Sequence, residues 1–427
     1  MSDEGRVKEK TYASEAVPKD QRMKTASLFG AMSGFVFMTT TLQAGATLGL
    51  SADFLTVLKA ILVGSIFLGV LVCIMAATAA KTGLTFAQIA AYAYGKVGAK
   101  FIGFLLAFSL IGWAAVDAGL MASALKTILP SVPHLVLSIV SVVLFIVTAI
   151  VGMKAMSKLG SLCIPIIGLF GIVSLVIGLH SLGGMNGLME YMPLPTNELK
   201  FSALVGLVIG SWIGCACSLL PDFMRFAKNE KVAVTMGAIF MFVLNPLLLI
   251  IGAVGAIATK SGDISFILAS QGLMIPGLLI GIFGNWGPAQ GNLYSTTLTW
   301  DNIFKLGHKN MTLVCGAIAL VFVSLDFFSY FGNFIIFLSN CVPAIIAVFI
   351  VDSLMTYKNG YPAVAEMKSV VDWRGILATV GGVGLAFAGL PGIPQIWGVL
   401  GAAALRVVLN LLGNDSPYKA YSQKNIQ

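Results

Sequence analysis

Twelve long apolar stretches constrain this chain more than any other feature of its sequence. About 20 consecutive apolar residues cross a bilayer as a helix, and we predict such spans over residues 25–50, 54–80, 101–128, 134–152, 157–179, 201–226, 231–258, 272–300, 310–326, 331–356, 374–391 and 395–413. Charged residues make up only 10% of the 427 residues, against about 25% in soluble proteins. This excludes a soluble enzyme and predicts an all-α integral membrane protein with twelve transmembrane helices.

The positive charges are distributed unevenly among the loops. Of the 26 Lys and Arg residues, 21 lie in the termini or the even-numbered loops, and only Lys126, Lys200 and Lys260 lie in the odd-numbered loops. The positive-inside rule places the cation-rich loops in the cytoplasm, and an even number of spans puts both termini there. Membrane orientation thus accounts for the net charge of +8, and we expect the lipid bilayer, but no nucleic acid, as a partner.

Two spans combine glycine with hydroxyl or amide side chains at mid-membrane depth. These polar clusters occupy residues 34–49 of the first span and 210–222 of the sixth. Broken helices persist in a membrane only where they line a cavity. A pair of them at matching places in two halves indicates a transporter built from inverted repeats. We therefore expect spans 1 and 6 to be discontinuous.

Because the two broken spans are five apart, the chain divides into two repeats of five spans with opposite orientation, which suits an alternating-access carrier. Residues 81–100 are too interrupted by polar residues to span, and we expect a separate short helix at the membrane surface there. The predicted organisation is a cytoplasmic tail (1–24), a first repeat (25–180), an extracytoplasmic loop (181–200), a second repeat (201–356), two accessory spans (357–413) and a cytoplasmic tail (414–427).

The third span carries an aromatic ring and a carboxyl group on one helical face, because Trp113 and Asp117 are four residues apart. Carboxyl groups inside a membrane are costly and usually face a cavity or a partner. A hydrogen bond to a neighbouring helix is the structural alternative for Asp117. If Trp113 lies opposite Trp212 of the sixth span, the two indoles can enclose a planar ring and leave its edges to polar groups.

The eighth span offers such polar groups between Gly284 and Thr297. Pro288 frees a backbone carbonyl, and the amides of Asn285 and Gln290 can each donate and accept hydrogen bonds. This pattern suits recognition of the edge of a heterocycle, although hydrogen bonds between helices are the structural alternative.

Patterns typical of enzymes and metal sites are missing from the sequence. The six cysteines lie inside spans and the three histidines lie far apart in loops, and no phosphate-binding, zinc-protease or serine-hydrolase motif is present. We therefore expect no enzymatic activity, no cofactor and no metal beyond a coupling cation.

Several short motifs, taken together, resemble the nucleobase:cation symporter-1 family, and most of all its bacterial cytosine permeases. In chain order they are Gly45–Gly49, Ala80–Thr85 with Tyr94-Gly95, Gly112-Trp113, Gly210-Ser211-Trp212, Asp222–Phe226, Asn292–Ser295, and Phe337–Ser339 with Pro343. The resemblance implies the leucine-transporter-type fold with the ligand between Trp113 and Trp212. The family's contacts to the edge of the ligand correspond to positions in spans 6 and 8 of this chain. Together with the third-span carboxyl group, they give the expected substrate-binding residues Trp113, Asp117, Ser211, Trp212, Gly214, Gly284, Asn285 and Gln290.

The resemblance also bears on the coupling cation. The family's sodium site uses carbonyl oxygens of the first span, here those of Gly34 and Met38, and two adjacent hydroxyl groups of the eighth span. Gly287 and Pro288 stand where those hydroxyl groups are expected. We therefore expect H+ coupling with Asp117 as the candidate proton carrier, while Na+ stays open because residues 295–297 could supply substitute ligands.

The expected function is import of a planar nucleobase-like heterocycle, with cytosine first, by cation-coupled alternating access. A purine base, a thiamine precursor, hydantoin and allantoin are alternative substrates. A membrane channel is the alternative from another class, although it needs a continuous polar lining or a selectivity loop. The expected location is the bacterial cytoplasmic (inner) membrane, and the expected state is a monomer.

Overall fold

The computed structural model describes residues 16–33, 35–151, 153–362, 370–413 and 418, and every regular element in these ranges is a helix. The helices are α1 (Thr25–Ser33), α2 (Thr39–Ser51), α3 (Phe54–Thr82), α4 (Phe86–Lys126), α5 (His134–Val151), α6 (Met153–Ser181), α7 (Met185–Met189), α8 (Phe201–Cys217), α9 (Leu219–Met224), α10 (Glu230–Ile239), α11 (Asn245–Thr259), α12 (Ile264–Ser270), α13 (Met274–Phe304), α14 (His308–Ser324), α15 (Phe331–Val351), α16 (Trp373–Phe387) and α17 (Pro394–Leu412). Short 3-10 turns cover Lys19–Gln21 and Phe327–Tyr330, and π-helical turns cover Phe240–Leu244 and Asp352–Thr356.

Each predicted span coincides with a helix or with two consecutive helices. Five stretches are long and apolar enough to cross a membrane by length and composition, namely Phe54–Thr82, Phe86–Lys126, Glu230–Thr259, Phe327–Thr356 and Pro394–Leu412. Shorter apolar helices include His134–Ile150, Pro165–Ser181, Phe201–Cys217, His308–Ser324 and Trp373–Phe387. The helical, apolar character of the chain is confirmed, and the count of twelve crossings stays a prediction.

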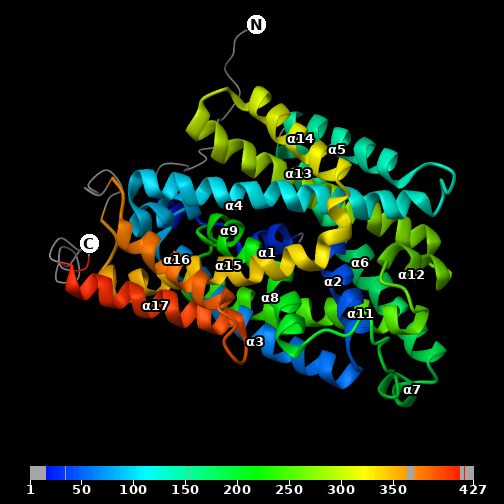
Figure 1. Ribbon diagram of the computed structural model, residues 1–427. Coiled ribbons are helices and arrows are strands. Elements are labelled where there is room, and N and C mark those ends of the chain that lie inside the picture. The colour runs from blue at the N-terminus through cyan, green and yellow to red at the C-terminus, as the bar shows by residue number, and fades with distance from the viewer. Residues whose placement is uncertain (1–15, 34, 152, 363–369, 414–417, 419–427) are drawn as a thin grey trace, which may run out of the picture.

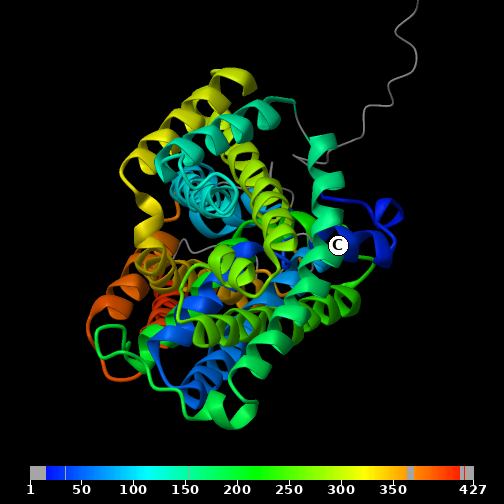
Figure 2. The same cartoon turned by 90° about the vertical axis from the view of Figure 1, so that its right-hand side faces the viewer.

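The helices pack as two groups, which Figures 1 and 2 show side by side. One group joins α4, α5, α13 and α14 around a buried cluster that includes Ile111, Phe145 and Leu293. The larger group holds the remaining long helices around a second cluster, with α2 packed on α11 and α3 packed on α8. Glycine permits the closest of these approaches, because a Cβ on Gly45 would lie 2.2 Å from the carbonyl oxygen of Leu249.

Both spans expected to be discontinuous are interrupted. The first span ends as α1 at Ser33 and resumes as α2 at Thr39, with Met38 in an extended conformation between them. The sixth span ends as α8 at Cys217, turns at Ser218 and resumes as α9 at Leu219. The leucine-transporter-type arrangement of broken spans is thus present in the described part of the chain.

The segment before the third span forms a short helix, as expected, and within α4 only the non-helical residue Gly95 separates it from the span. Thr85 and Gln88 form a reciprocal cap at the start of α4, which then continues to Lys126 with a kink at Gly95. Gly95 has φ +79°, a conformation that glycine adopts readily, and the carbonyl oxygen of Val370 would lie 2.7 Å from a Cβ there. The kink lets residues 370–372 hydrogen-bond to α4, through Val97 N–H to Val370 O and Asp372 N–H to Tyr94 O.

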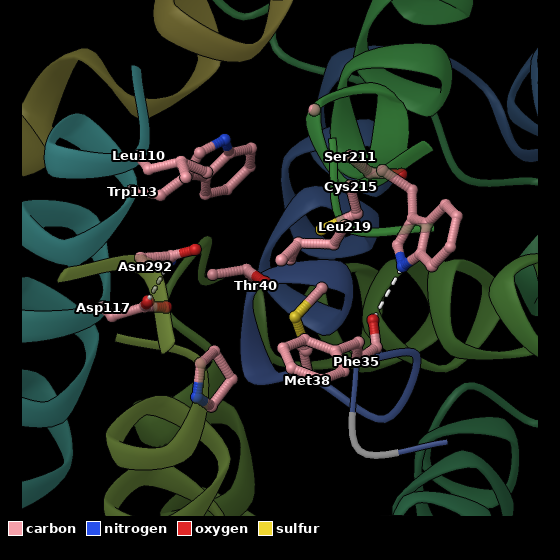
Figure 3. A pocket seen from close by; sticks show the side chains of 13 residues that line it. Phe35, Met38, Thr40, Leu110, Trp113, Asp117, Ser211, Cys215, Leu219 and Asn292 are labelled. Atoms are coloured by element: carbon pink, nitrogen blue, oxygen red, sulfur yellow. Dashed lines mark hydrogen bonds between the residues drawn. The ribbon is translucent and has the colours of Figure 1, made fainter. Parts of the chain in front are cut away.

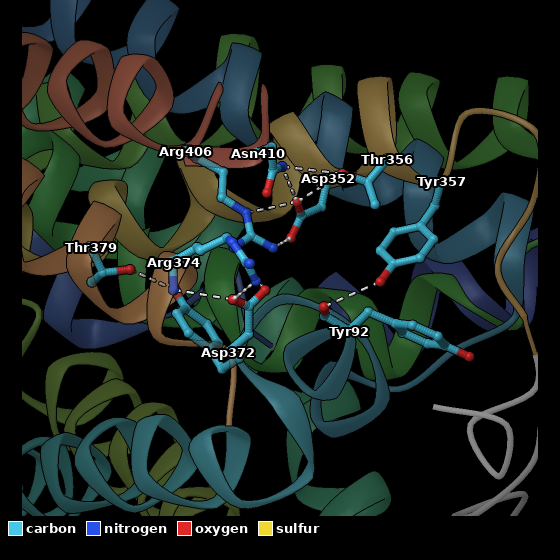
Figure 4. Close-up of polar contacts among 10 residues, drawn as sticks. Tyr92, Asp352, Thr356, Tyr357, Asp372, Arg374, Thr379, Arg406 and Asn410 are labelled. Carbon is cyan, nitrogen blue, oxygen red and sulfur yellow. Dashed lines mark hydrogen bonds and ion pairs between the residues drawn. The ribbon is translucent and has the colours of Figure 1, made fainter. Parts of the chain in front are cut away.

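A buried ion-pair network joins the accessory helices to the tenth span (Figure 4). Arg406 of α17 donates from Nε and Nη2 to the two carboxylate oxygens of Asp352, each at 2.8 Å. Its Nη1 donates to Asp372 at 2.9 Å, and Asp372 also caps α16 by accepting the N–H of Arg374. Since Arg406 is 0% exposed and Asp352 is 2% exposed, the network holds α15, α16 and α17 together without contact with solvent.

Candidate functional site

The two interruptions meet at one place in the fold. The indole N–H of Trp212, on α8, donates to the carbonyl oxygen of Phe35 at 2.7 Å. Phe35 lies in the gap between α1 and α2, where its carbonyl is outside any helical ladder. The bond therefore joins the break of the first span to the sixth span.

A pocket lies against these breaks, between α2, α4, α8, α9 and α13. Its walls are Phe35, Met38, Thr40, Leu110, Trp113, Asp117, Ser211, Trp212, Gly214, Cys215, Leu219, Pro288 and Asn292. Figure 3 shows Trp113 and Asp117 entering from α4, with Ser211 and Cys215 on the far side on α8. The enclosed space is about 20 Å³, which is room for one water molecule. The walls must therefore separate to admit a planar ring.

Asp117 carries the only carboxyl group that the described part of the chain places on the wall of this pocket. It is 1% exposed, and the Nδ2 of Asn292 donates to its Oδ2 over a long distance of 3.4 Å. No ion pair to Asp117 forms among the described residues. A buried charge without a cationic partner is costly, so Asp117 is suited to accept either a proton or the N–H groups of a ligand.

Trp113 lies one helical turn before Asp117 and faces the same pocket. Its ring packs edge-on against Phe331 and Phe334, with centroids 6.3 and 5.4 Å away. Gly214 leaves space beside it, because a Cβ there would lie 3.5 Å from the indole nitrogen of Trp113. These contacts fix the ring while leaving it on the pocket wall.

The α8 wall offers less hydrogen-bonding capacity than the sequence suggests. Ser211 lines the pocket, but its hydroxyl donates to the carbonyl oxygen of Val208 at 2.7 Å within the same helix. The N–H of Trp212 is likewise engaged with Phe35. Trp212, Gly214 and Cys215 also line this wall.

Three residues of the eighth span expected to contact substrate do not line this pocket. Asn285 donates to the carbonyl oxygen of Gly281 in its own helix, and Gln290 donates to that of Thr148 on α5. Gly284 lies against the first span, since a Cβ there would be 2.4 Å from the hydroxyl oxygen of Thr39. Because α13 is continuous, Pro288 and Asn292 share its pocket face while Asn285 and Gln290 are rotated away.

The elements of the predicted sodium site fit poorly in the described residues. Gly34 lies outside them, and the carbonyl oxygen of Met38 already accepts the N–H of Thr41 at 3.2 Å. The substitute hydroxyl groups also point elsewhere, because Thr296 donates to Ala107 on α4 and Thr297 to Thr312 on α14. Na+ prefers several hard oxygen ligands, and these three oxygen atoms of spans 1 and 8 already have hydrogen-bond partners.

Sequence reasoning did not single out several pocket residues. Phe35, Thr40, Leu110, Cys215 and Leu219 carry no motif, and their place on the wall follows from the two helix breaks. Asn292 had a detectable signal, because it lies four residues after Pro288 and therefore on the same helical face.

Comparison with known proteins agrees with this architecture. The family model described as permease for cytosine/purines, uracil, thiamine, allantoin matches residues 16–412. Cytosine permease of Escherichia coli (strain K12) is 30% identical over 403 residues, which are 94% of this chain and 95% of that protein, and the cytosine permease of Escherichia coli O157:H7 matches equally.

Solved structures share the fold at lower identity. The inward-facing conformation of Mhp1 matches with a TM-score of 0.80 and 16% identity, over 92% of this chain and 91% of that one. Mhp1, a nucleobase-cation-symport-1 family transporter, in a closed conformation with bromovinylhydantoin bound, matches with a TM-score of 0.78 and 16% identity over 96% of both chains. These relatives are transporters and not enzymes, and this chain is a multi-pass membrane permease that belongs to the nucleobase:cation symporter-1 family.

Proposed function

We propose that this protein imports cytosine across the bacterial cytoplasmic membrane by proton-coupled alternating access. One observation carries the proposal: a buried pocket at the breaks of spans 1 and 6 combines two indole rings with a polar edge made of Asp117 and Asn292. The rings suit the faces of a flat heterocycle, and the carboxyl and amide oxygens suit its N–H and amino groups.

The choice of cytosine within the family rests on this polar edge and on the 30% identical cytosine permease. Cytosine presents an amino group and a ring N–H, both of which can donate to Asp117 or Asn292. A purine base, a thiamine precursor, hydantoin and allantoin are the alternative substrates, because each is flat or partly flat and carries N–H groups.

Proton coupling is favoured by the chemistry of the two candidate cation positions. Asp117 is a buried carboxyl group without an ion pair among the described residues, so a proton there removes an uncompensated charge. Spans 1 and 8 offer little for Na+, since Gly287 and Pro288 have no side-chain oxygen. The proton would enter with substrate and leave with it on the cytoplasmic side.

Membrane orientation and assembly complete the proposal. Both termini lie in the cytoplasm, in keeping with the cation-rich even-numbered loops. A monomer is the proposed working state. A channel is disfavoured because the pocket is closed and small instead of a continuous polar path.

Uptake of radiolabelled cytosine into proteoliposomes tests this function. We expect saturable, concentrative uptake when an inward proton gradient is imposed and choline replaces Na+, with competition strongest from unlabelled cytosine among uracil, adenine, hypoxanthine, hydantoin and allantoin. Strict dependence on Na+ would refute proton coupling, and single-channel currents would refute a carrier.

The variant Asp117→Asn separates coupling from transport. We expect it to lose the pH dependence of uptake and the ability to concentrate cytosine, because an amide cannot release a proton. Retention of proton-driven accumulation in this variant would assign the proton to another group.

A further inference from the structure

Thr40 is a buried hydroxyl group on the pocket wall that the family motifs do not include. It is 3% exposed, and its Oγ1 has no hydrogen-bond partner among the described residues. Figure 3 shows its side chain between the α4 wall and the α8 wall of the pocket. The hydroxyl of Thr39 donates to the carbonyl oxygen of Ile280 on α13 at 3.1 Å, and Thr41, whose buried hydroxyl is also unpaired, is not among the residues that line the pocket. Buried hydroxyl groups are almost always hydrogen-bonded, so the free one at Thr40 calls for a partner.

The helix that carries Thr40 begins at the same place. Met38 is the N-cap of α2 and makes no side-chain capping bond, and the helix continues for 13 residues. The N–H groups of Thr39 and Thr40 make no hydrogen bond within the described parts of the chain. Unpaired N–H groups and the helix dipole give this end a partial positive charge. The end of α2 therefore favours a hydrogen-bond acceptor as the partner of Thr40.

The α4 and α13 walls offer hydrogen-bond acceptors, whereas the start of α2 offers donors. The two walls present the carboxyl group of Asp117, whose carbonyl oxygen can accept a hydrogen bond with or without a proton on the group, and the amide oxygen of Asn292. Among the described residues, the only other titratable side chain on the pocket wall is the Cys215 thiol, and none that lines the pocket is cationic. A ligand that satisfies both sides must therefore present N–H or amino donors to Asp117 and an acceptor to Thr40.

We propose that Thr40 and the start of α2 form a subsite for the ring carbonyl oxygen of the transported base. This inference rests on the proposed function and narrows its substrate class to oxo-heterocycles with a donor edge. Cytosine belongs to that class through its 2-oxo group, as do hypoxanthine and hydantoin. Adenine, which has an amino group but no carbonyl, leaves the Thr40 hydroxyl unpaired and is disfavoured.

The test compares an oxo base with its counterpart lacking the oxygen, in the purified full-length protein. Isothermal titration calorimetry gives the affinities for cytosine and 4-aminopyrimidine, and for hypoxanthine and purine as a second pair. We expect the wild-type protein to prefer the oxo member by about tenfold or more, which is the typical worth of one satisfied hydrogen bond. A wild-type protein without that preference would overturn the subsite.

Two substitutions assign the preference to the hydroxyl group. Thr40→Val keeps the size and shape of the side chain and removes the hydroxyl, and we expect it to reduce the preference to about twofold or less. Thr40→Ser keeps the hydroxyl and serves as the matched control, with the preference retained. Since 4-aminopyrimidine also differs from cytosine at a ring N–H, the change in preference between Thr40→Val and wild type isolates the contribution of Thr40.

The outcomes separate this inference from the function on which it rests. If the wild-type protein binds bases but Thr40→Val retains the full oxo preference, the subsite is refuted and the proposed function stands. If the wild-type protein binds none of the bases, both are refuted. If Thr40→Val does not fold, the same comparison in Thr40→Ala decides the question.

Discussion

Two buried aspartates of this permease have opposite surroundings. Asp352 accepts two 2.8 Å hydrogen bonds from Arg406 and a further one from Thr356. Asp117 accepts a single bond from Asn292 at 3.4 Å and forms no ion pair with any described residue. Both side chains are nearly inaccessible to solvent, at 2% and 1% exposure. Burial alone therefore does not distinguish the ion-paired carboxyl group of Asp352 from the proposed proton carrier Asp117.

The difference lies in how far each charge is compensated. Buried charges are retained for structure when their partners satisfy them, and removal of one partner leaves the other uncompensated. The network of Arg406, Asp352 and Asp372 meets that description and joins three helices. The pocket does not, since Asp117 and Thr40 both keep unused hydrogen-bonding capacity. Unused capacity at a buried position indicates a place for a ligand or a proton.

The same substitution at the two aspartates gives the largest expected contrast. We expect Asp352→Asn to lower the free energy of unfolding by about 1.5–3 kcal/mol, because Arg406 loses its charge-assisted hydrogen bonds to Asp352 while it keeps the ion pair with Asp372. Asp117→Asn should change it by less than about 1 kcal/mol, because no ion pair is lost. Thermal unfolding in detergent measures both variants. Equal destabilisation by the two substitutions would contradict the view that Asp352 stabilises the fold and Asp117 does not.

Substitution of an aromatic residue should affect ligand affinity in the pocket and stability near the Arg406 network. We expect Trp113→Ala to weaken cytosine binding about 5- to 150-fold, the range for removal of an aromatic ring stacked on a base. Tyr94→Phe, which removes the 2.8 Å hydrogen bond to Thr379 beside the network, should leave that affinity unchanged and cost about 1 kcal/mol of stability. Calorimetry and thermal unfolding of both variants measure the contrast. Normal binding by Trp113→Ala would refute stacking.

Two glycines provide the smallest contrast. A Cβ on Gly375, at the start of α16, would lie 2.2 Å from the carbonyl oxygen of Ala93 on α4. We expect Gly375→Ala to cost about 1–3 kcal/mol through this clash. No atom lies within 4 Å of a Cβ on Gly287, beside the pocket, so Gly287→Ala should change stability by less than about 1 kcal/mol. Thermal unfolding compares them, and similar midpoints would show that the α4–α16 contact can relax.

Much of the fold could be predicted because membrane crossing imposes strong rules on sequence. Apolar runs located the helices, and glycine with polar residues located the breaks in spans 1 and 6. The short helix expected within residues 81–100 is present before Gly95, but the third span begins directly after that residue, at a kink whose contacts come from residues 370–372, far along the chain. The sequence around Gly95 does not predict that long-range contact.

The site was predictable where helical spacing decides it. Trp113 and Asp117 share the pocket, as their four-residue spacing indicates, and Met38, Ser211, Trp212 and Gly214 line it as well. Thr40 escaped notice because its orientation depends on the turn between α1 and α2. The role of Arg406 escaped notice for another reason, since its partner Asp352 lies 54 residues away.

The bond between Trp212 and Phe35 has a consequence for the transport cycle. It connects the break of the first span to α8, the helix that precedes the break of the sixth span. Separating them inside the bilayer would strand one donor and one acceptor, at about 1–3 kcal/mol for each group. We therefore expect the two interrupted spans to move together as one rigid body during transport. The third and eighth spans stay in place in this motion, and the substrate is released as the interrupted spans move relative to them.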